Sequence, residues 1–335
     1  MKYEFLPNQD VTTDLHQCFK RQLKESYVDM LVQLNSHDHR LFSDPLIEFF
    51  HDIDASRFNG FHCFVYHYSI ELAEKSNFQE AARLVKLVAS EAYQCLPKFV
   101  ASGAIDASLL SVIFDQVKKG TTHSHIALTR VNQETELIVS RQAAQGIEKL
   151  TEVHPQLASH VDTLVESILF FDSAGPTNER ALSLTCDRFQ SLILINGTID
   201  PGWVFLIDKI IHEAAHTYLY AINLREELVL NTEGSVHASP LRKDARDMVG
   251  IYHATFVIQR LIVGLTHLLG HASLTDADRS EIIALLRTYH SSVDDGFATV
   301  KKHGLLSPIA RELIESGQDL VKSLQRPRAV VDASP

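Results

Sequence analysis

Two histidines four residues apart are the feature of this sequence that most directly predicts chemistry. His212, Glu213 and His216 belong to the run His-Glu-Ala-Ala-His, an HExxH pattern. Residues four apart on a helix lie on one face, about 6 Å apart along the axis, so both imidazoles can face a single metal ion. The surrounding residues are apolar, and a histidine buried among them needs a polar partner, which a metal supplies. We therefore expect His212 and His216 to bind a metal.

The spacing by itself is weak support, because with 18 histidines a chance HExxH has odds of about one in fifteen. His267 and His271 illustrate this, since they share the spacing but lack the glutamate. We expect these two to be ordinary surface or helix-capping histidines. For His212 and His216 the alternative is a hydrogen-bonded pair in the core.

A catalytic metal site usually has three protein ligands and open positions, so a third ligand is needed. The candidates are Glu226, Glu227, Glu233, His237 and His253. Both Glu226 and Glu227 are expected on the motif helix, about four turns past His212, and cannot curl back to it. His237 is expected in a loop and stays an alternative. We favour His253, because it lies within the apolar run 248–263, where an unpaired imidazole is costly.

Arg246 is a candidate for binding a substrate acid beside the metal. It precedes His253 by seven residues, which on one continuous helix places it on nearly the same face and about 10 Å away. Gly250, between them, clears space beside the helix. An arginine two turns from a metal suits a bidentate hold on the far carboxylate of a metal-chelating acid. The alternative is a surface salt bridge; Arg242 and Arg260 are weaker candidates for the same role.

The elements that position these residues are predicted by periodicity. Residues 11–170 have a mostly helical pattern, within which the aromatic stretch 61–68 fits either a strand or a buried helix. Short strands are expected at 182–185 and 191–195, the second closed by an Asn-Gly turn. This pattern predicts a mainly α protein with a small β-sheet (α+β), in which 1–170 form a helical region.

Residues 171–330 are expected to form the metal-binding catalytic region, built on two long helices. Asp200-Pro201 is a strong helix start, so the motif helix should run over 201–227. A loop at 231–240 leads to the second long helix, 244–269. Two further helices are expected at 276–289 and 309–324.

Composition excludes several classes of function. The formal net charge is -11, from 42 acidic and 31 basic residues, and an acidic surface repels phosphate backbones, so we expect no nucleic-acid partner. The start of the chain has no signal-peptide layout and no apolar run approaches about 20 residues, which predicts a cytoplasmic protein that does not enter a membrane. The four cysteines are scattered without a CxxC pair, which is typical of reduced, buried thiols.

The segment 182–261 resembles the HExxH-motif proteins of ribosomal-peptide gene clusters. Their usual layout has HExxH, then a segment like A-P-W-R-x-D-P-R-P, then G-x-x-H-G-x-[FY]. Here HExxH is followed by Ser-Pro-Leu-Arg-Lys-Asp-Ala-Arg at 239–246 and by Gly-Ile-Tyr-His-Ala-Thr-Phe at 250–256. The sequence departs from the pattern at Leu241, Ala245, Asp247 and Ala254, where the family often has tryptophan, proline, proline and glycine.

This resemblance implies an iron(II)- and 2-oxoglutarate-dependent oxygenase that β-hydroxylates a residue of a ribosomally made precursor peptide. It implies that His212, His216 and His253 are iron ligands. It also implies that Arg246, together with Arg242, lies near the 2-oxoglutarate carboxylate. Glu213 would then orient a ligand or a water.

Two other functions stay open. HExxH is most often the mark of a zinc peptidase, in which Glu213 would act as general base on a zinc-bound water. The sequence departs from those families, because no histidine stands at the metzincin third position and Glu233 is expected in a loop. The other alternative is a non-catalytic peptide-binding protein whose histidines hold a metal structurally.

Overall fold

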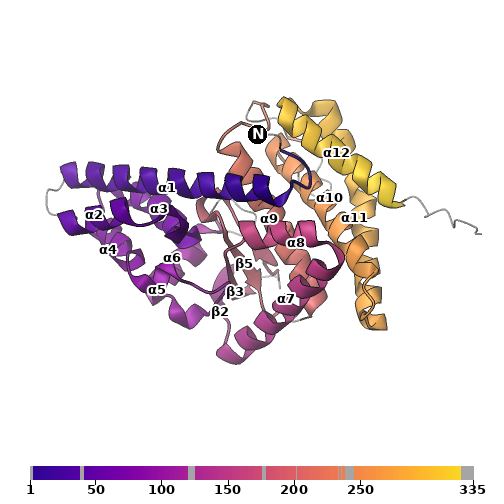
Figure 1. The fold of residues 1–335 in the computed structure, drawn as a ribbon, viewed down its shortest axis with the longest axis horizontal. Coiled ribbons are helices and arrows are strands. Elements are labelled where there is room, and N and C mark those ends of the chain that lie inside the picture. Colours follow the sequence, from indigo (N-terminus) through magenta and orange to yellow (C-terminus); the bar gives the residue numbers. More distant parts are fainter. Residues whose placement is uncertain are drawn as a thin grey trace, which may run out of the picture. The chain divides into compact units, whose positions relative to one another are not determined.

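The computed structural model describes residues 3–37, 41–119, 125–175, 179–200, 202–232, 234, 236–237 and 245–325. It is 68% helical, and the described residues contain 12 α-helices and one small mixed sheet of five strands (Figure 1). The predicted fold class, mainly α with a small sheet, is therefore confirmed.

The chain packs into two compact units. The sheet unit comprises Asn8–Ile147 and Ser159–Arg225, and the C-terminal unit comprises Met1–Pro7, Glu148–Ala158 and Glu226–Pro335. The limits of the units fall within α7 (Gln133–Val153) and α8 (Pro155–Leu164). These units cut across the expected division at residue 170, because the HExxH helix packs with the N-terminal helices and the sheet.

Helices build the first half of the sheet unit. They are α1 (Gln9–His37), α2 (Asp44–Asp52), α3 (Gly60–Glu74), α4 (Phe78–Val88), α5 (Glu91–Gln94) and α6 (Ala107–Gln116). Figure 1 shows α1 as the long indigo helix, and α2 and α3 pack on it. The aromatic stretch is part of α3, so the buried-helix alternative holds; Asn59 and His62 form a capping box at its start. Phe61 and Phe64 are buried in the core of this unit.

The sheet has the strand order β1-β3-β5-β4, with β2 also paired to β3. The strands are β1 (Phe99–Val100), β2 (Ala127–Arg130), β3 (Ser167–Ala174), β4 (Ser183–Leu184) and β5 (Leu192–Asn196). β3 runs parallel to β1 and β5 and antiparallel to β2, while β4 is an antiparallel edge strand on β5.

The two strands expected from sequence correspond to β4 and β5, within a residue or two at each end. The helical pattern expected up to residue 170 is wrong for the last four of those residues, which begin β3. The first five residues of β3 are all buried, so this strand lacks the alternation that marks a half-buried strand in a sequence.

The long C-terminal helices are α9 (Trp203–Asn223), α10 (Met248–Leu269), α11 (Asp276–His303) and α12 (Pro308–Gln325). α9 ends four residues before the expected 227, and α10 begins four residues after the expected 244. α11 runs well past the expected 289 and ends at His303, with Gly304 as its C-cap. The α12 prediction holds within one residue at each end.

The C-terminal unit has α10 as its central helix, with α11 and α12 beside it in orange to yellow (Figure 1). The Tyr252 hydroxyl donates to the Ala310 carbonyl at 2.9 Å, which ties α10 to α12. Residues 3–7 also join this unit: the Phe5 ring packs edge-on against Phe256 at 5.2 Å, and the Arg260 guanidinium donates to the Phe5 carbonyl.

α10 corrects one sequence expectation. Among the described residues it is the one helix long and apolar enough to cross a membrane, although the sequence pattern predicts no such stretch. In the structure 78% of that stretch is buried, as in the core helix of a folded domain. Arg260, in the middle of α10, is buried with its partners inside the C-terminal unit.

Candidate metal site

The motif helix α9 is apolar on nearly every side and is buried accordingly. Its first turn is capped at Gly202, whose N–H donates to Asp200 Oδ1 at 2.7 Å. Asp200 therefore lies before the N-cap of α9 and is not itself the N-cap. Pro201 lies outside the described residues. The helix packs against β4 and β5, which fixes the direction of each side chain on it.

His212 and His216 share one face of α9, as their spacing predicts. Their ring centres lie 5.0 Å apart with the planes at 59°, and both side chains are half-buried. The Tyr220 ring continues the face, stacked at 6.1 Å from His216. A ligated imidazole has its centre about 3 Å from the metal, so two rings at roughly a right angle around one ion stand about 5 Å apart. The pair therefore fits a shared metal ion.

Glu213 turns toward the sheet. It is 2% exposed, and Ser183 on the edge strand β4 lies close enough to lower the pKa of its carboxyl group. Burial raises the pKa of Glu213 to about 7, against the opposing effects of Ser183 and the Lys209 charge. A carboxyl group placed this way can anchor α9 to β4 beside the histidine pair.

An ion pair next to the motif was missed by sequence reasoning. Lys209 Nζ lies 2.7 Å from Asp208 Oδ2, with side chains 11% and 1% exposed. Lys209 also lies over the Phe205 ring at 5.5 Å. The signal was present in the sequence, because two adjacent charges interrupt an apolar helix and Lys209 precedes Glu213 by one turn.

His253, the favoured third ligand, lies on α10 and therefore in the C-terminal unit, whereas His212 and His216 lie in the sheet unit. It is 9% exposed, and burial lowers its pKa to about 4, with a smaller opposing effect from Asp247. The imidazole is consequently neutral at pH 7, the form in which histidine binds a metal. A site formed by all three histidines stays a prediction.

The helical placement of Arg246 is wrong. α10 begins at Met248 with Asp247 as its cap, and Arg246 lies before it in an isolated bridge with His237. The Arg246 N–H donates to the His237 carbonyl at 2.9 Å, and the reverse bond is 2.7 Å. Gly250 lies beside the arginine, since a Cβ built there would be in ordinary van der Waals contact with Arg246 Cδ at 3.6 Å, while its tight neighbour would be Asp247 Oδ1 at 3.0 Å. The arginine stem thus lies over the first turn of α10. Arg242 lies outside the described residues.

Of the other candidates for the third ligand, the described residues include Glu226, Glu227 and His237. Glu226 and Glu227 are not on the motif helix, since α9 ends at Asn223. His237 is half-buried, and its ring stacks on His303 at 4.5 Å within the C-terminal unit. Glu233 lies outside the described residues.

His267 and His271 have protein partners, which agrees with a structural role. His267 Nδ1 is 2.8 Å from the Val263 carbonyl of its own helix. His271 Nε2 is 2.8 Å from Glu152 Oε2, and its Nδ1 accepts the Ser273 N–H at 3.1 Å. The expectation of a surface position is wrong for His271, which is 8% exposed.

The four cysteines are free, as expected, but they are not all buried. Cys63 is buried and Cys95 is exposed, while Cys18 and Cys186 are half-buried. Burial raises the pKa of the Cys63 and Cys186 thiols, to about 12 for Cys186. Thiols with raised pKa values are poor nucleophiles.

Within either unit, the described residues bring together no group of three or more His, Cys, Asp or Glu side chains arranged to hold a metal. The chain matches no protein-family model, and no curated protein is significantly similar to it.

Proposed function

We propose that this protein is a cytoplasmic iron(II)- and 2-oxoglutarate-dependent oxygenase that hydroxylates a side chain of a ribosomally made peptide. The observation that carries the proposal is the facing pair His212 and His216, half-buried on α9 with ring centres 5.0 Å apart. The sequence after the pair supports the particular chemistry, because it resembles a family with that activity.

Three neutral imidazoles would hold the metal: His212 and His216 from α9 and His253 from α10. Iron(II) with 2-oxoglutarate, when bound, supplies the oxidation of a C–H bond by dioxygen. With three protein ligands, the metal would still be able to bind the keto acid and dioxygen. The low pKa of His253 keeps its lone pair available at neutral pH.

The chain's other residues bind and orient. Arg246 would bind the far carboxylate of 2-oxoglutarate through its guanidinium fork. Its stem lies over Gly250, one turn before His253, so the arginine and the third histidine belong to the same end of α10. Glu213 would act through α9, by anchoring the helix to Ser183 and thereby orienting the two rings.

A zinc-dependent peptidase is the second candidate. It is favoured by the glutamate next to His212, which in such enzymes acts as the base on a metal-bound water. The burial of Glu213 is a point against it, since that carboxyl group is only 2% exposed. The two functions make different demands on Glu213 and His253, and variants of these residues separate them.

The test is an anaerobic titration of the full chain with iron(II) and then 2-oxoglutarate. Chelation by the keto acid is read as a visible charge-transfer absorption, and oxygen is then admitted and succinate measured. We expect absorption and succinate in the unmodified protein, and the loss of both in His253→Ala. The matched control is His267→Ala, which removes another histidine of α10, one that contacts the Val263 carbonyl, and should retain both signals.

The outcomes exclude one another. Zinc-dependent peptide cleavage that survives His253→Ala and is lost in Glu213→Gln would establish the peptidase instead. Metal binding without succinate and without cleavage would point to a structural metal in a peptide-binding protein. Failure of His212→Ala to weaken metal binding would overturn all three functions.

A further inference from the structure

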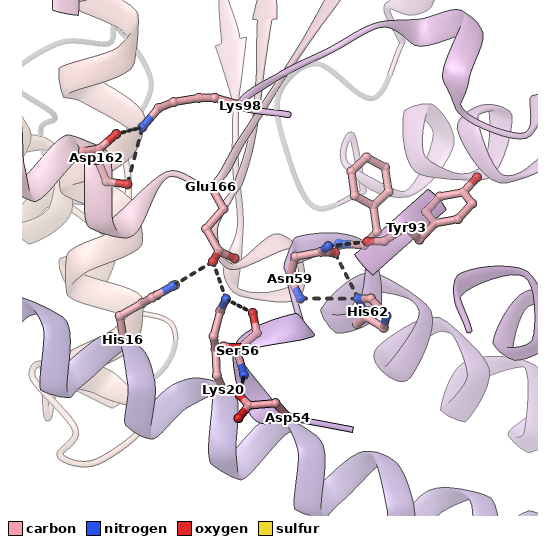
Figure 2. A network of polar contacts seen from close by, with 11 residues as sticks. His16, Lys20, Asp54, Ser56, Asn59, His62, Tyr93, Lys98, Asp162 and Glu166 are labelled. Carbon is pink, nitrogen blue, oxygen red and sulfur yellow. Dashed lines mark hydrogen bonds and ion pairs between the residues drawn. The ribbon is translucent and has the colours of Figure 1, made fainter. Parts of the chain in front are cut away.

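A second polar cluster lies in the sheet unit, away from the HExxH motif. Its centre is Glu166, in the link between α8 and β3 (Figure 2). Lys20 of α1 donates to Glu166 Oε1, and His16 Nε2 lies 3.3 Å from the same oxygen. Lys20 also donates to the Ser56 carbonyl at 2.8 Å. One carboxylate thus joins α1 to the start of the central strand.

The charge state of this cluster is set by its contacts. Burial favours the protonated form of Glu166, but contacts with His16 and Lys20 outweigh it, and the pKa is lowered. Glu166 is therefore ionised and balances the charge of Lys20, which is 6% exposed. The ion pair with Lys20 by itself already balances the charge of Glu166.

The Glu166–Lys20 ion pair does not explain why His16 is buried beside it. It is 7% exposed, and among the described residues its Nδ1 has no hydrogen-bond partner, nor does Glu166 Oε2. The 3.3 Å contact of Nε2 with Glu166 is an ion-pair distance without good hydrogen-bond geometry. Buried polar atoms are nearly always hydrogen-bonded, so an unpaired imidazole nitrogen here points to a missing partner.

His16 and Lys20 line a pocket of about 450 Å³, a volume in the range of small-molecule sites. One wall is the face of α1 that carries these two residues and Arg21; the other is the turn of Asp54 and Ser56. With Lys20 balanced by Glu166, the remaining full charges are Arg21 on one wall and Asp54 on the other. Opposite charges on opposite walls complement a ligand that carries both.

We propose that this pocket binds a small zwitterion, of which a free α-amino acid is the simplest form. The ligand carboxylate binds Arg21, and the ammonium group binds Asp54. His16, whose Nδ1 has no hydrogen-bond partner among the described residues, lines the same pocket and supplies a further polar contact for the ligand. Binding here is independent of the proposed oxygenase.

The experiment is isothermal calorimetry of the full chain without added iron, with alanine, glutamine and phenylalanine as probes. Each probe is paired with the amine and the carboxylic acid of the same skeleton, which lack one charge. We expect at least one amino acid to bind, and both single-charge analogues to bind about tenfold more weakly or worse, as expected for loss of a charged contact.

Variants place the binding in this pocket. Arg21→Gln and Asp54→Asn should each weaken binding about tenfold, and asparagine at 54 keeps the acceptor for the Ser56 N–H. Asp29→Asn is the control, because Asp29 lines the neighbouring hollow and not this one. His16→Phe should weaken binding without changing the charge of the walls. No binding by any probe at about 10 mM, or binding that survives both Arg21→Gln and Asp54→Asn, overturns the proposal.

Discussion

Two pairs of histidines in this chain have the same four-residue spacing but different surroundings. His212 and His216 both lie within α9 and share one of its faces, with their ring centres 5.0 Å apart. His267 and His271 turn to separate partners, because α10 ends at Leu269 with Gly270 as its cap and His271 leaves the helix. Two histidines four residues apart therefore share a helix face only where the helix continues through both of them. The neighbouring helices and strands then determine what each ring contacts.

Each pair also has a charged contact beside it, and these contacts differ in burial. Asp208 and Lys209, near the HExxH pair, are both almost fully buried. Glu152, the partner of His271, is 59% exposed. A carboxylate in water loses little when its partner is removed, whereas a buried one is left without solvation. The surroundings of the first pair should thus be the more sensitive to substitution.

The largest difference is expected in metal affinity. Replacing His212 and His216 by alanine should lower the affinity for iron(II) or zinc by roughly 100-fold or more, since it removes two ligands. The same change at His267 and His271 should leave it unaltered. Anaerobic calorimetry measures both; equal losses for the two double variants would abolish the distinction between the pairs.

The next effect is on stability near the motif. Lys209→Met should lower the free energy of unfolding by about 3–5 kcal/mol, because it removes the ion-pair partner of a buried carboxylate. The double variant Asp208→Asn, Lys209→Met should recover most of the lost free energy of unfolding. Urea unfolding followed by circular dichroism gives both values. A loss below about 1 kcal/mol for Lys209→Met would show that the Asp208–Lys209 ion pair contributes no more to stability than an exposed ion pair does.

A smaller loss is expected at the second pair. His271→Ala removes the contacts to Glu152 and to the Ser273 N–H, which should lower the free energy of unfolding by about 1–2 kcal/mol. Metal binding should not change. The same urea experiment tests this, with Glu152→Gln as a milder control that keeps an acceptor.

The smallest effect concerns pH. Burial, and then the charge of His267, lower the pKa of His154, whose ring lies 4.5 Å from His267. As pH falls below about 6.5, the unfolded chain binds a proton at this position before the folded chain does, so stability decreases toward acid. His267→Gln should move the His154 pKa upward and lessen that decrease. Proton NMR titration of the His154 ring reads the shift directly; an unchanged pKa would show that His267 has no part in setting it.

Local sequence signals predict much of the helical framework. The apolar runs around HExxH and in 248–269 predict the two long helices, and the short strands before the motif lie within two residues of their expected positions. The errors have physical causes. Arg246 is excluded from α10 because the Asp247 carboxylate accepts the Gly250 N–H and starts the helix there. The helical pattern extends wrongly into β3 because a strand buried on both faces has no alternation.

By itself the sequence determined which side chains share a helix face, since α-helical geometry depends only on residue spacing. It thereby determined the pairing of His212 with His216 and the apolar setting of the motif. Only the tertiary structure decided what those faces meet: that Glu213 turns to Ser183, that Lys209 pairs with Asp208, and that His16 lies behind a pocket with Glu166. These contacts depend on the packing of whole elements, as do the burial and pKa values of the groups involved, and spacing along the chain does not encode that packing.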